Sequence, residues 1–169
     1  MKKGQEIKSM LKKINDDVEN KKDYIVPLNK IDITSNHVEV YPHLKYEGND
    51  FFYSMNDNSL NHLCNRLEIG TRYISKCLPV SQALVNDNLN FWIKNNKNKN
   101  LMLRTQNNTV RAIMSDRYKR IDSDVVANSC LSKLMDMGAE LKYSYYDGDN
   151  MNITAVLPKL EGEVVEGDV

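Results

Sequence analysis

The chain has 169 residues, of which 41% are apolar, and its 23 Lys and Arg residues balance 23 Asp and Glu residues. A chain of this length and composition is expected to form one soluble domain, or at most two small ones, with a core that needs neither disulfides nor a metal. The charge balance excludes a uniformly basic protein and a long acidic tail. Asn occurs 21 times and Lys outnumbers Arg by 17 to 6, a bias typical of AT-rich codons in bacteria and their phages.

Residues 1–22 are predicted to form an amphipathic helix that docks onto the rest of the chain, and residues 23–169 to form an α+β domain. The apolar residues of the helix recur at spacings of three and four, which places them on one stripe: Ile7, Met10, Leu11, Ile14 and Val18. The sequence contains no apolar run of the length of an export signal or a membrane span. We therefore expect a cytoplasmic protein of a bacterial host cell, without a membrane partner.

Short β-prone runs alternate with turn residues in the next part of the chain. They predict strands or hairpins at residues 24–26, 31–34, 37–41 and 51–53.

Three short helices are predicted to follow. Asp57 or Asn58 is expected to cap the first, and Gly70 to end it in the left-handed conformation. Thr71 is expected to cap the second and Ser81 to start the third. The predicted inner face of the third helix consists of Leu84, Val85, Leu89, Trp92 and Ile93.

Two hairpins and a helix are predicted in the last third of the chain. Residues 101–106 and 109–115 flank an Asn-Asn pair that tolerates the positive φ of a tight turn. A helix is expected to follow Ser123 and to end at Gly138, with its apolar face formed by Val125, Val126, Cys130, Leu131, Leu134 and Met135. The second hairpin turns at residues 147–150, and its alternating apolar face is predicted as Leu141, Tyr143, Tyr145, Met151, Ile153, Ala155 and Leu157. The predicted fold class is α+β, with short helices packed on antiparallel hairpins in a single domain.

The zero net charge conceals an uneven distribution along the chain. Residues 94–120 contain eight Lys or Arg residues and one Asp, whereas residues 121–169 contain three cations and ten anions. A basic hairpin with Trp92 and Tyr118 at its edges can follow a nucleic-acid backbone while the aromatic rings stack on bases. The predicted nucleic-acid-binding residues are Lys94, Lys97, Lys99, Arg104, Arg111, Arg117, Lys119, Arg120 and Tyr118. In the alternative interpretation, the basic segment pairs with the acidic segment of the same domain and Trp92 belongs to the core.

Residues that could carry catalysis or bind a metal show no recognisable pattern. The seven glycines do not cluster as a phosphate-binding loop, and the three histidines lack the spacing of metal ligands. Cys64, Cys77 and Cys130 are expected to be buried, reduced thiols. We therefore predict no metal, no cofactor and no catalytic residue, and an enzyme is a third possibility behind two kinds of binding protein.

The most distinctive local segment is the corner Ser115-Asp116-Arg117-Tyr118, where a predicted strand ends before a helix. Asp116 can accept main-chain hydrogen bonds, Arg117 can present its planar guanidinium to a phosphate or carboxylate, and Tyr118 can stack or anchor the corner. A purely structural corner with an internal Asp and Arg bond is the alternative.

This corner, preceded by the strand at residues 110–115 and followed by Ile121-Asp122, resembles the phage- and plasmid-encoded family called domain of unknown function 932. Weaker resembling features are the helix with Leu60, Leu63 and Leu67 leading to Ile69, and the strand at residues 153–157 followed by Gly162-Glu163-Val164 and Gly167-Asp168. The resemblance spans residues 59–169 and implies an α+β fold and a mobile-element setting, without assigning catalytic residues. Residues 1–52 have no match, and family members usually continue past the Gly-Asp step, so the resemblance raises the expectation that the chain is a fragment lacking its final strands.

Two functions from different classes follow from these observations. The first is a non-enzymatic accessory protein of a phage or mobile genetic element that binds nucleic acid, in particular a single strand, through the basic hairpin. The second is a protein-interaction module, such as an inhibitor of a host defence factor, that acts through its acidic C-terminal face on a host or phage protein.

Overall fold

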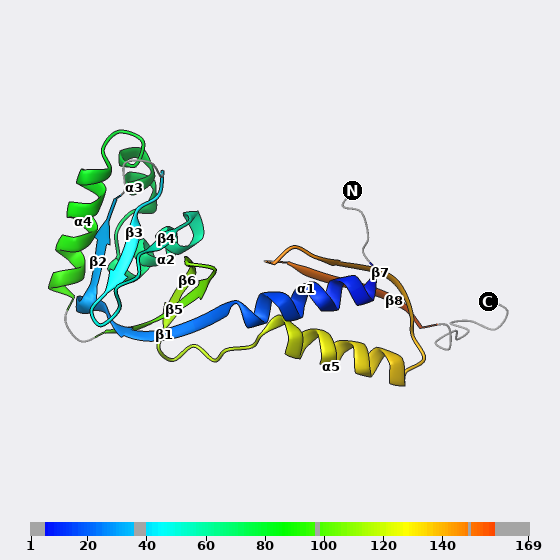
Figure 1. The fold of residues 1–169 in the computed structure, drawn as a ribbon. Helices are drawn as coiled ribbons and strands as arrows, with labels where there is room; N and C mark the ends of the chain where they lie inside the picture. The colour runs from blue at the N-terminus through cyan, green and yellow to red at the C-terminus, as the bar shows by residue number, and fades with distance from the viewer. Residues whose placement is uncertain (1–5, 36–39, 97–98, 149, 158–169) are drawn as a thin grey trace, which may run out of the picture. The chain divides into compact units, whose positions relative to one another are not determined.

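The computed structural model describes residues 6–35, 40–96, 99–148 and 150–157 (Figure 1). Contacts within the chain divide it into two compact units. The larger unit is Lys21–Lys119, and the smaller unit combines Met1–Asn20 with Arg120–Val169. The predicted α+β fold, with short helices packed on antiparallel hairpins, is confirmed. Among the described residues, no helix has the length and apolar character needed to cross a membrane.

Six strands form one mixed sheet in the larger unit, in the order β1-β5-β6-β4-β3-β2. Neighbouring strands are antiparallel except for β4 and β6, which run parallel. The predicted β5–β6 hairpin is confirmed, and Asn107 and Asn108 close it with φ angles of 47° and 61°. The strands are β1 (Lys21–Pro27), β2 (Ile31–Thr34), β3 (His43–Tyr46), β4 (Tyr53–Met55), β5 (Asn100–Gln106) and β6 (Thr109–Ser115).

Three tyrosines show that this sheet is strongly curled. Tyr24 of β1 lies 5.7 Å from Tyr46 of β3 and 6.2 Å from Tyr53 of β4, measured between ring centroids. Three strands separate β1 from β3 in the sheet, a spacing of roughly 19 Å in a flat sheet with strands ~4.8 Å apart. The two rings therefore meet only because the sheet bends round, and Asn49 ties the cluster together by donating hydrogen bonds to the hydroxyls of Tyr46 (2.7 Å) and Tyr53 (3.0 Å).

Three helices and a short 3-10 turn complete the larger unit. They are α2 (Asp57–Leu67), α3 (Thr71–Cys77), α4 (Gln82–Asn95) and the turn η1 (Leu28–Lys30). Helix α2 packs against β6, and α4 runs alongside β2 (Figure 1). Their buried apolar side chains and those of the sheet form one core, which includes Leu63, Leu89, Leu103 and Ile113.

Asn90 of α4 covers the outer edge of the sheet at β2. Its side-chain Nδ2 donates to the carbonyl of Ile33, and its Oδ1 accepts from the amide of Ile33, both at 2.8 Å. One side chain thus replaces the two hydrogen bonds that a further strand would make with this residue, which protects the edge against pairing with another chain.

The smaller unit consists of two helices and a hairpin. Helix α1 (Ile7–Glu19) packs against α5 (Ser123–Asp136) and against β7 (Glu140–Tyr146), which pairs with β8 (Met151–Val156). The buried hydrophobic cluster of this unit consists of Met10, Ile14, Ala127 and Tyr146. The predicted apolar stripe of the N-terminal helix and the second predicted hairpin are both confirmed.

Several predicted helix ends are wrong by one or two residues. The N-cap of α2 is Asn56, not Asp57 or Asn58, because Asn56 and Ser59 form a reciprocal capping box. Ser81 caps α4 as predicted, by accepting from the amide of Leu84. Gly70, not Thr71, occupies the N-cap position of α3. Helix α5 has its N-cap at Asp122, one residue before the predicted start.

The buried faces of α4 and α5 are narrower than predicted. On α4 the buried apolar stripe is Val85, Leu89 and Ile93, whereas Leu84 and Trp92 are 45% and 44% exposed. On α5 only Ala127 and Leu131 are buried, because the smaller unit covers one side of this helix. Three residues of its predicted inner face are exposed: Val125, Cys130 and Met135.

Two strand predictions also need correction. In β7 the buried side chains are Ser144 and Tyr146, not Tyr143 and Tyr145, because a register shift after Leu141 changes the alternation of faces. The strand predicted at 37–41 lies partly outside the described residues, and Val40 and Tyr41 form a bend, so that β3 starts only after Pro42. Phe51 and Phe52 precede β4 and are exposed.

Candidate functional site

The C-terminal end of α2 is the centre of the candidate site. Glu68 ends the helix in the left-handed conformation, with φ 60° and ψ 33°, and the amide of Ile69 donates to the carbonyl of Cys64 at 2.9 Å. Gly70, which was predicted to take this conformation, has φ −63°. The chain therefore turns two residues earlier than predicted, and a glutamate side chain that is 85% exposed stands at the turn.

A pocket of about 540 Å³ opens on one side of this helix end. Its walls come from three places in the chain, namely the last turn of α2, the start of β5, and the corner after β6. Arg66, Lys99 and Arg117 bring three cations to it, and Glu68 and Asp116 bring two carboxylates. The remaining lining residues are Asn65, Asn100, Leu101 and Ser115. Lys99 Nζ lies 4.0 Å from Glu68 Oε1, the outer limit of an ion pair.

The Ser115-Asp116-Arg117-Tyr118 corner is a main-chain turn that opens toward this pocket. The amide of Tyr118 donates to the carbonyl of Ser115 at 3.0 Å, and this bond leaves the side chains of Asp116 and Arg117 exposed. Tyr118 stacks under the guanidinium of Arg104, 5.8 Å from its ring centroid. Three of the four corner residues thus line the pocket, while Tyr118 anchors the turn.

A second pocket, of about 350 Å³, also has Glu68 in its lining. Its lining consists of Leu67, Glu68, Ile69, Trp92 and Asn96. Phe91 meets Trp92 edge to face, with ring centroids 5.4 Å apart and planes at 88°. Since Glu68 lines both pockets, they form one continuous surface, which we call the α2-end surface.

The predicted basic residues fall into three groups. Four of them are exposed, namely Lys94, Lys99, Arg117 and Lys119. Arg111 is half-buried, and its Nη1 donates to Gln106 Oε1 at 3.5 Å. Arg104 is 7% exposed, and its Nε donates to Asp23 Oδ1 at 3.2 Å.

Two predicted residues lie apart from these groups. Arg120 belongs to the smaller unit, where it pairs with Asp122. Lys97 lies outside the described residues. Arg117 and Lys99 are therefore the predicted cations that the structure brings together in one pocket.

Arg66 and Glu68 are site residues that the sequence did not indicate. Glycine two positions after Glu68 signals the end of a helix, but no sequence signal marks a glutamate for the left-handed conformation, which is rare outside Gly, Asn and Asp. Arg66 lies in the last turn of α2, where a cation is commonly explained by the helix dipole.

Of the three cysteines predicted to be buried, Cys64 is buried, whereas Cys77 is half-buried and Cys130 is exposed. Burial raises the pKa of Cys64 to about 11, which disfavours the nucleophilic thiolate. Burial, and to a lesser degree the nearby charge of Arg66, lower the pKa of His62, whose Nδ1 accepts from the amide of Ile113 at 3.3 Å. Within the described part of the chain, no group of three or more His, Cys, Asp or Glu residues is arranged to hold a metal ion.

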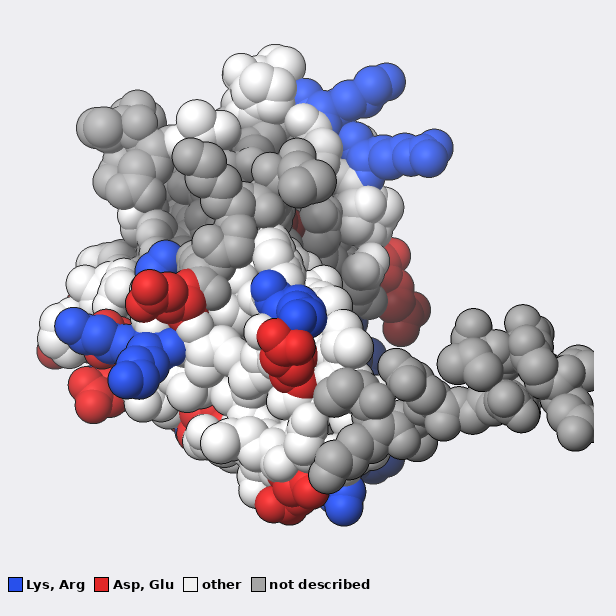
Figure 2. Space-filling view, turned by 90° about the vertical axis from the view of Figure 1, so that its right-hand side faces the viewer, with Lys and Arg blue, Asp and Glu red and all other residues white. Residues whose placement is uncertain are grey.

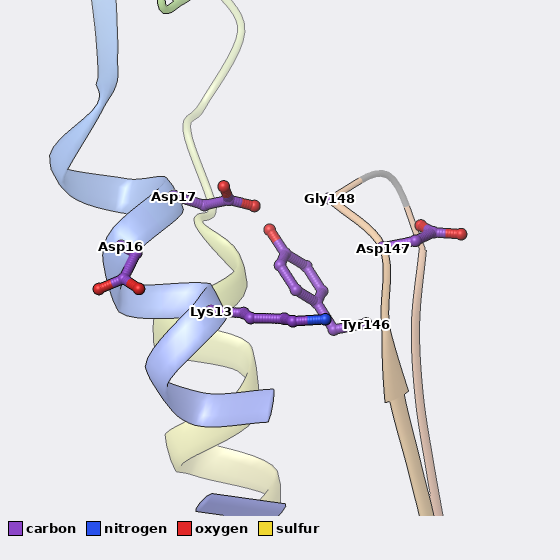
Figure 3. Close-up of a pocket in the computed structure, with 6 residues that line it drawn as sticks. All are labelled: Lys13, Asp16, Asp17, Tyr146, Asp147 and Gly148. Carbon is purple, nitrogen blue, oxygen red and sulfur yellow. The ribbon is translucent and has the colours of Figure 1, made fainter. Parts of the chain in front are cut away.

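The smaller unit has a pocket of its own, of about 330 Å³, between α1 and the β7–β8 turn. Figure 3 shows Lys13 and Asp17 of α1 directed toward the hairpin, and Tyr146 directed back toward the helix. Asp16 and Asp147 also line the pocket, but their carboxylates point away from its centre (Figure 3). The acidic side chains therefore do not converge on one point.

Charged side chains of both signs are interspersed on the face of the molecule drawn in Figure 2, with uncharged surface between them. This face does not present an uninterrupted basic patch. A nucleic-acid interface on this face would therefore consist of local groups of cations and aromatic rings.

No protein-family model matches the chain, and neither a curated protein nor a solved structure matches it. The functional assignment therefore depends on the geometry of the chain's own residues.

Proposed function

We propose that the larger unit binds single-stranded nucleic acid on the α2-end surface, as a non-enzymatic accessory protein of a phage or mobile genetic element. The observation that carries the proposal is the pair of adjoining pockets, which joins the exposed indole of Trp92 to the cations of Arg66, Lys99 and Arg117. The resemblance to domain of unknown function 932 motivates the mobile-element setting.

Single strands suit this surface better than a duplex. Proteins that bind single strands combine cations that follow the phosphates with aromatic side chains on which unpaired bases stack, each stacked base contributing about 1–3 kcal/mol. Trp92 offers a flat, exposed ring, with the edge-to-face ring of Phe91 beside it. The bases of a duplex are already stacked on one another, so they are not accessible to an indole on a surface.

Four exposed cations of residues 94–120 are suited to phosphate contacts. Lys94, Lys99, Arg117 and Lys119 are exposed, and Arg117 can hold two phosphate oxygens with its planar guanidinium. Arg104 is not part of the proposed surface, because its guanidinium is buried beside Asp23 and against the ring of Tyr118.

A salt titration with a labelled single-stranded oligonucleotide tests this proposal. If about four cations, Lys99 and Arg117 among them, contact phosphates, the logarithm of the binding constant falls against the logarithm of the salt concentration with a slope of about −3. The double variant Lys99→Ala and Arg117→Ala is expected to bind more weakly and to reduce the slope to about −1.5.

The matched control removes two exposed cations from the smaller unit, Lys12→Ala and Lys133→Ala. It changes the net charge by the same amount and is expected to retain the slope of the unmodified protein. No binding at low salt, or equal weakening by both double variants, would contradict the proposal.

The second candidate function is a protein-interaction module that meets a basic partner, such as a host defence factor, through the acidic face of the smaller unit. It is favoured by the three aspartates, Asp16, Asp17 and Asp147, that line the pocket at the β7–β8 turn. A pull-down with the charge-reversed variant Asp147→Lys tests it, since a partner that recognises this face is lost from the variant. A captured protein that remains bound after the reversal would argue against an acidic interface. Asp149, the other acidic residue of this turn, lies outside the described residues.

A further inference from the structure

Resting on the proposed function, we propose that the pocket between Trp92 and Glu68 is a nucleobase subsite that selects guanine. Trp92 stacks on the base, and the carboxylate of Glu68 accepts hydrogen bonds from its N1–H and its exocyclic amino group. The subsite thus adds base selectivity to a surface whose other contacts are made with phosphates.

The size and lining of the pocket suit one flat base. Its volume of about 350 Å³ lies at the lower end of the range of small-molecule sites, about 300–1,000 Å³. Leu67 is 4% exposed and supplies an apolar wall, and the 44% exposed indole of Trp92 supplies a stacking surface. Polar groups come from Glu68 and Asn96. An apolar slot with a few polar groups at its rim is the usual arrangement of a base-binding pocket.

Glu68 is held in a conformation that directs its carboxylate outward. The left-handed region is unfavourable for a residue that carries a Cβ. The amide of Glu68 contributes to the helix cap through the carbonyls of Asn65 and Cys64, so the main chain is fixed while the side chain is 85% exposed. Lys99 is its ion-pair partner at 4.0 Å, too far for a close hydrogen-bonded pair, so the carboxylate retains capacity to accept from a ligand.

The surroundings of the Glu68 carboxylate indicate which part of a nucleotide it contacts. A glutamate beside Arg66, Lys99 and Arg117 would repel a phosphate that approached it. A base, in contrast, presents N–H donors that a carboxylate can accept. Because Glu68 belongs to both pockets, a strand that places its base against Trp92 can place the neighbouring phosphates over the cations of the larger pocket.

Among the bases, guanine matches a carboxylate best. An ionised carboxylate only accepts hydrogen bonds, and its two oxygens suit two donors that lie side by side. Guanine offers such a pair in N1–H and the exocyclic amino group. Adenine and cytosine place a ring acceptor beside their amino group, and thymine and uracil place carbonyls on both sides of their N–H, so a carboxylate meets repulsion from each of them.

The test uses the full chain, whose only tryptophan is Trp92, so that intrinsic fluorescence reports directly on the pocket. Labelled oligothymidylates that carry one central dG, dA or dC are titrated, and anisotropy and tryptophan emission are recorded together. Oligouridylates with the same central bases form a parallel arm that distinguishes RNA from DNA. We expect the dG oligonucleotide to bind about tenfold more tightly than the others and to quench the emission.

Two variants make the test specific to the two side chains. Glu68→Gln removes a negative charge and is expected to strengthen binding to every oligonucleotide. The quantity to compare is therefore the ratio of the affinities for the dG and the all-dT oligonucleotides. This ratio is expected to fall from about ten to about one in Glu68→Gln, and to remain unchanged in Glu47→Gln, an exposed glutamate that pairs with Lys30. Trp92→Leu is expected to weaken binding of the dG oligonucleotide by about tenfold.

The outcomes separate this inference from the proposed function. Binding of all oligonucleotides with equal affinity and unchanged tryptophan emission would overturn the guanine subsite while leaving nucleic-acid binding in place. Tighter binding of an oligonucleotide other than dG would overturn the assignment of the base. Absence of binding to every oligonucleotide would overturn both.

Discussion

The larger unit builds a six-stranded sheet over a core of 20 buried residues, whereas in the described part of the smaller unit a two-stranded hairpin and two helices share a core of four. A two-stranded hairpin is only marginally stable in water, so the smaller unit depends on the few side chains between its helices and its hairpin. Both pockets of the α2-end surface lie in the larger unit. The proposed interface is therefore built on the part of the chain with the larger core.

The strongest test of this difference is one substitution made in each unit. Ile14 of α1 and Ile93 of α4 are both 0% exposed, and truncation of a buried isoleucine to alanine costs about 2–5 kcal/mol. We expect Ile14→Ala to unfold the smaller unit, because so small a core cannot absorb this loss. Ile93→Ala is expected to lower the stability of the larger unit without unfolding it.

Hydrogen exchange resolved by residue distinguishes the two outcomes. In Ile14→Ala, amides of α1, α5 and the β7–β8 hairpin should lose protection while those of β5 and β6 keep it. Equal loss of protection throughout the chain in both variants would show that the two units unfold as one. It would contradict the proposed difference in stability between them.

A smaller effect is expected at the edge of the larger sheet. Asn90→Ala leaves the amide and carbonyl of Ile33 without the two 2.8 Å bonds from the side chain, which should cost about 1–3 kcal/mol in urea unfolding. The opened edge of β2 should also promote association of the protein, which light scattering can detect.

Asn88→Ala is the matched control, because this residue lies about half a turn away on the same helix and its Nδ2 donates a long hydrogen bond of 3.4 Å to the hydroxyl of Tyr73. A change within about 0.5 kcal/mol is expected for it. If the two variants were equally stable, the side chain of Asn90 would not be what closes the edge.

Local patterns in the sequence predicted most of the elements but not the faces of two helices. The spacing of Met10 and Ile14 predicts a buried stripe on α1, and Asn107-Asn108 predicts a tight hairpin turn, since both effects act between near neighbours in the chain. The exposure of Trp92 and Val125 depends on which elements cover α4 and α5, and periodicity does not contain that information.

The candidate site was predicted only in part for the same reason. Lys99 and Arg117 stand out as exposed cations of a basic segment, but Arg66 and Glu68 join them only because the end of α2 lies beside β5 and β6. Arg104 belongs to the same basic segment and is nevertheless buried, because Asp23 is opposite it in the β1–β5 register, 81 residues away in the chain. Pairings over such a distance cannot be obtained from local sequence patterns.

The smallest expected effect is a pH dependence of the larger unit that arises from His62. Its pKa in the folded protein is lowered below the usual value of about 6.5, chiefly by burial and further by Arg66, and its Nδ1 accepts from the amide of Ile113. Above pH 6.5 the imidazole is neutral in both the folded and the unfolded chain, so it adds no pH dependence there. Below pH 6.5 the unfolded chain takes up the proton first, so the free energy of unfolding falls until the pH has passed the lowered folded-state pKa.

Urea unfolding at pH 7.5 and 5.5 measures this loss of unfolding free energy. His62→Asn keeps an acceptor near the position of Nδ1 but does not titrate, so it should show a smaller loss over the same interval. An equal loss in the variant and the unmodified protein would mean that other groups, not His62, set the pH dependence of this unit.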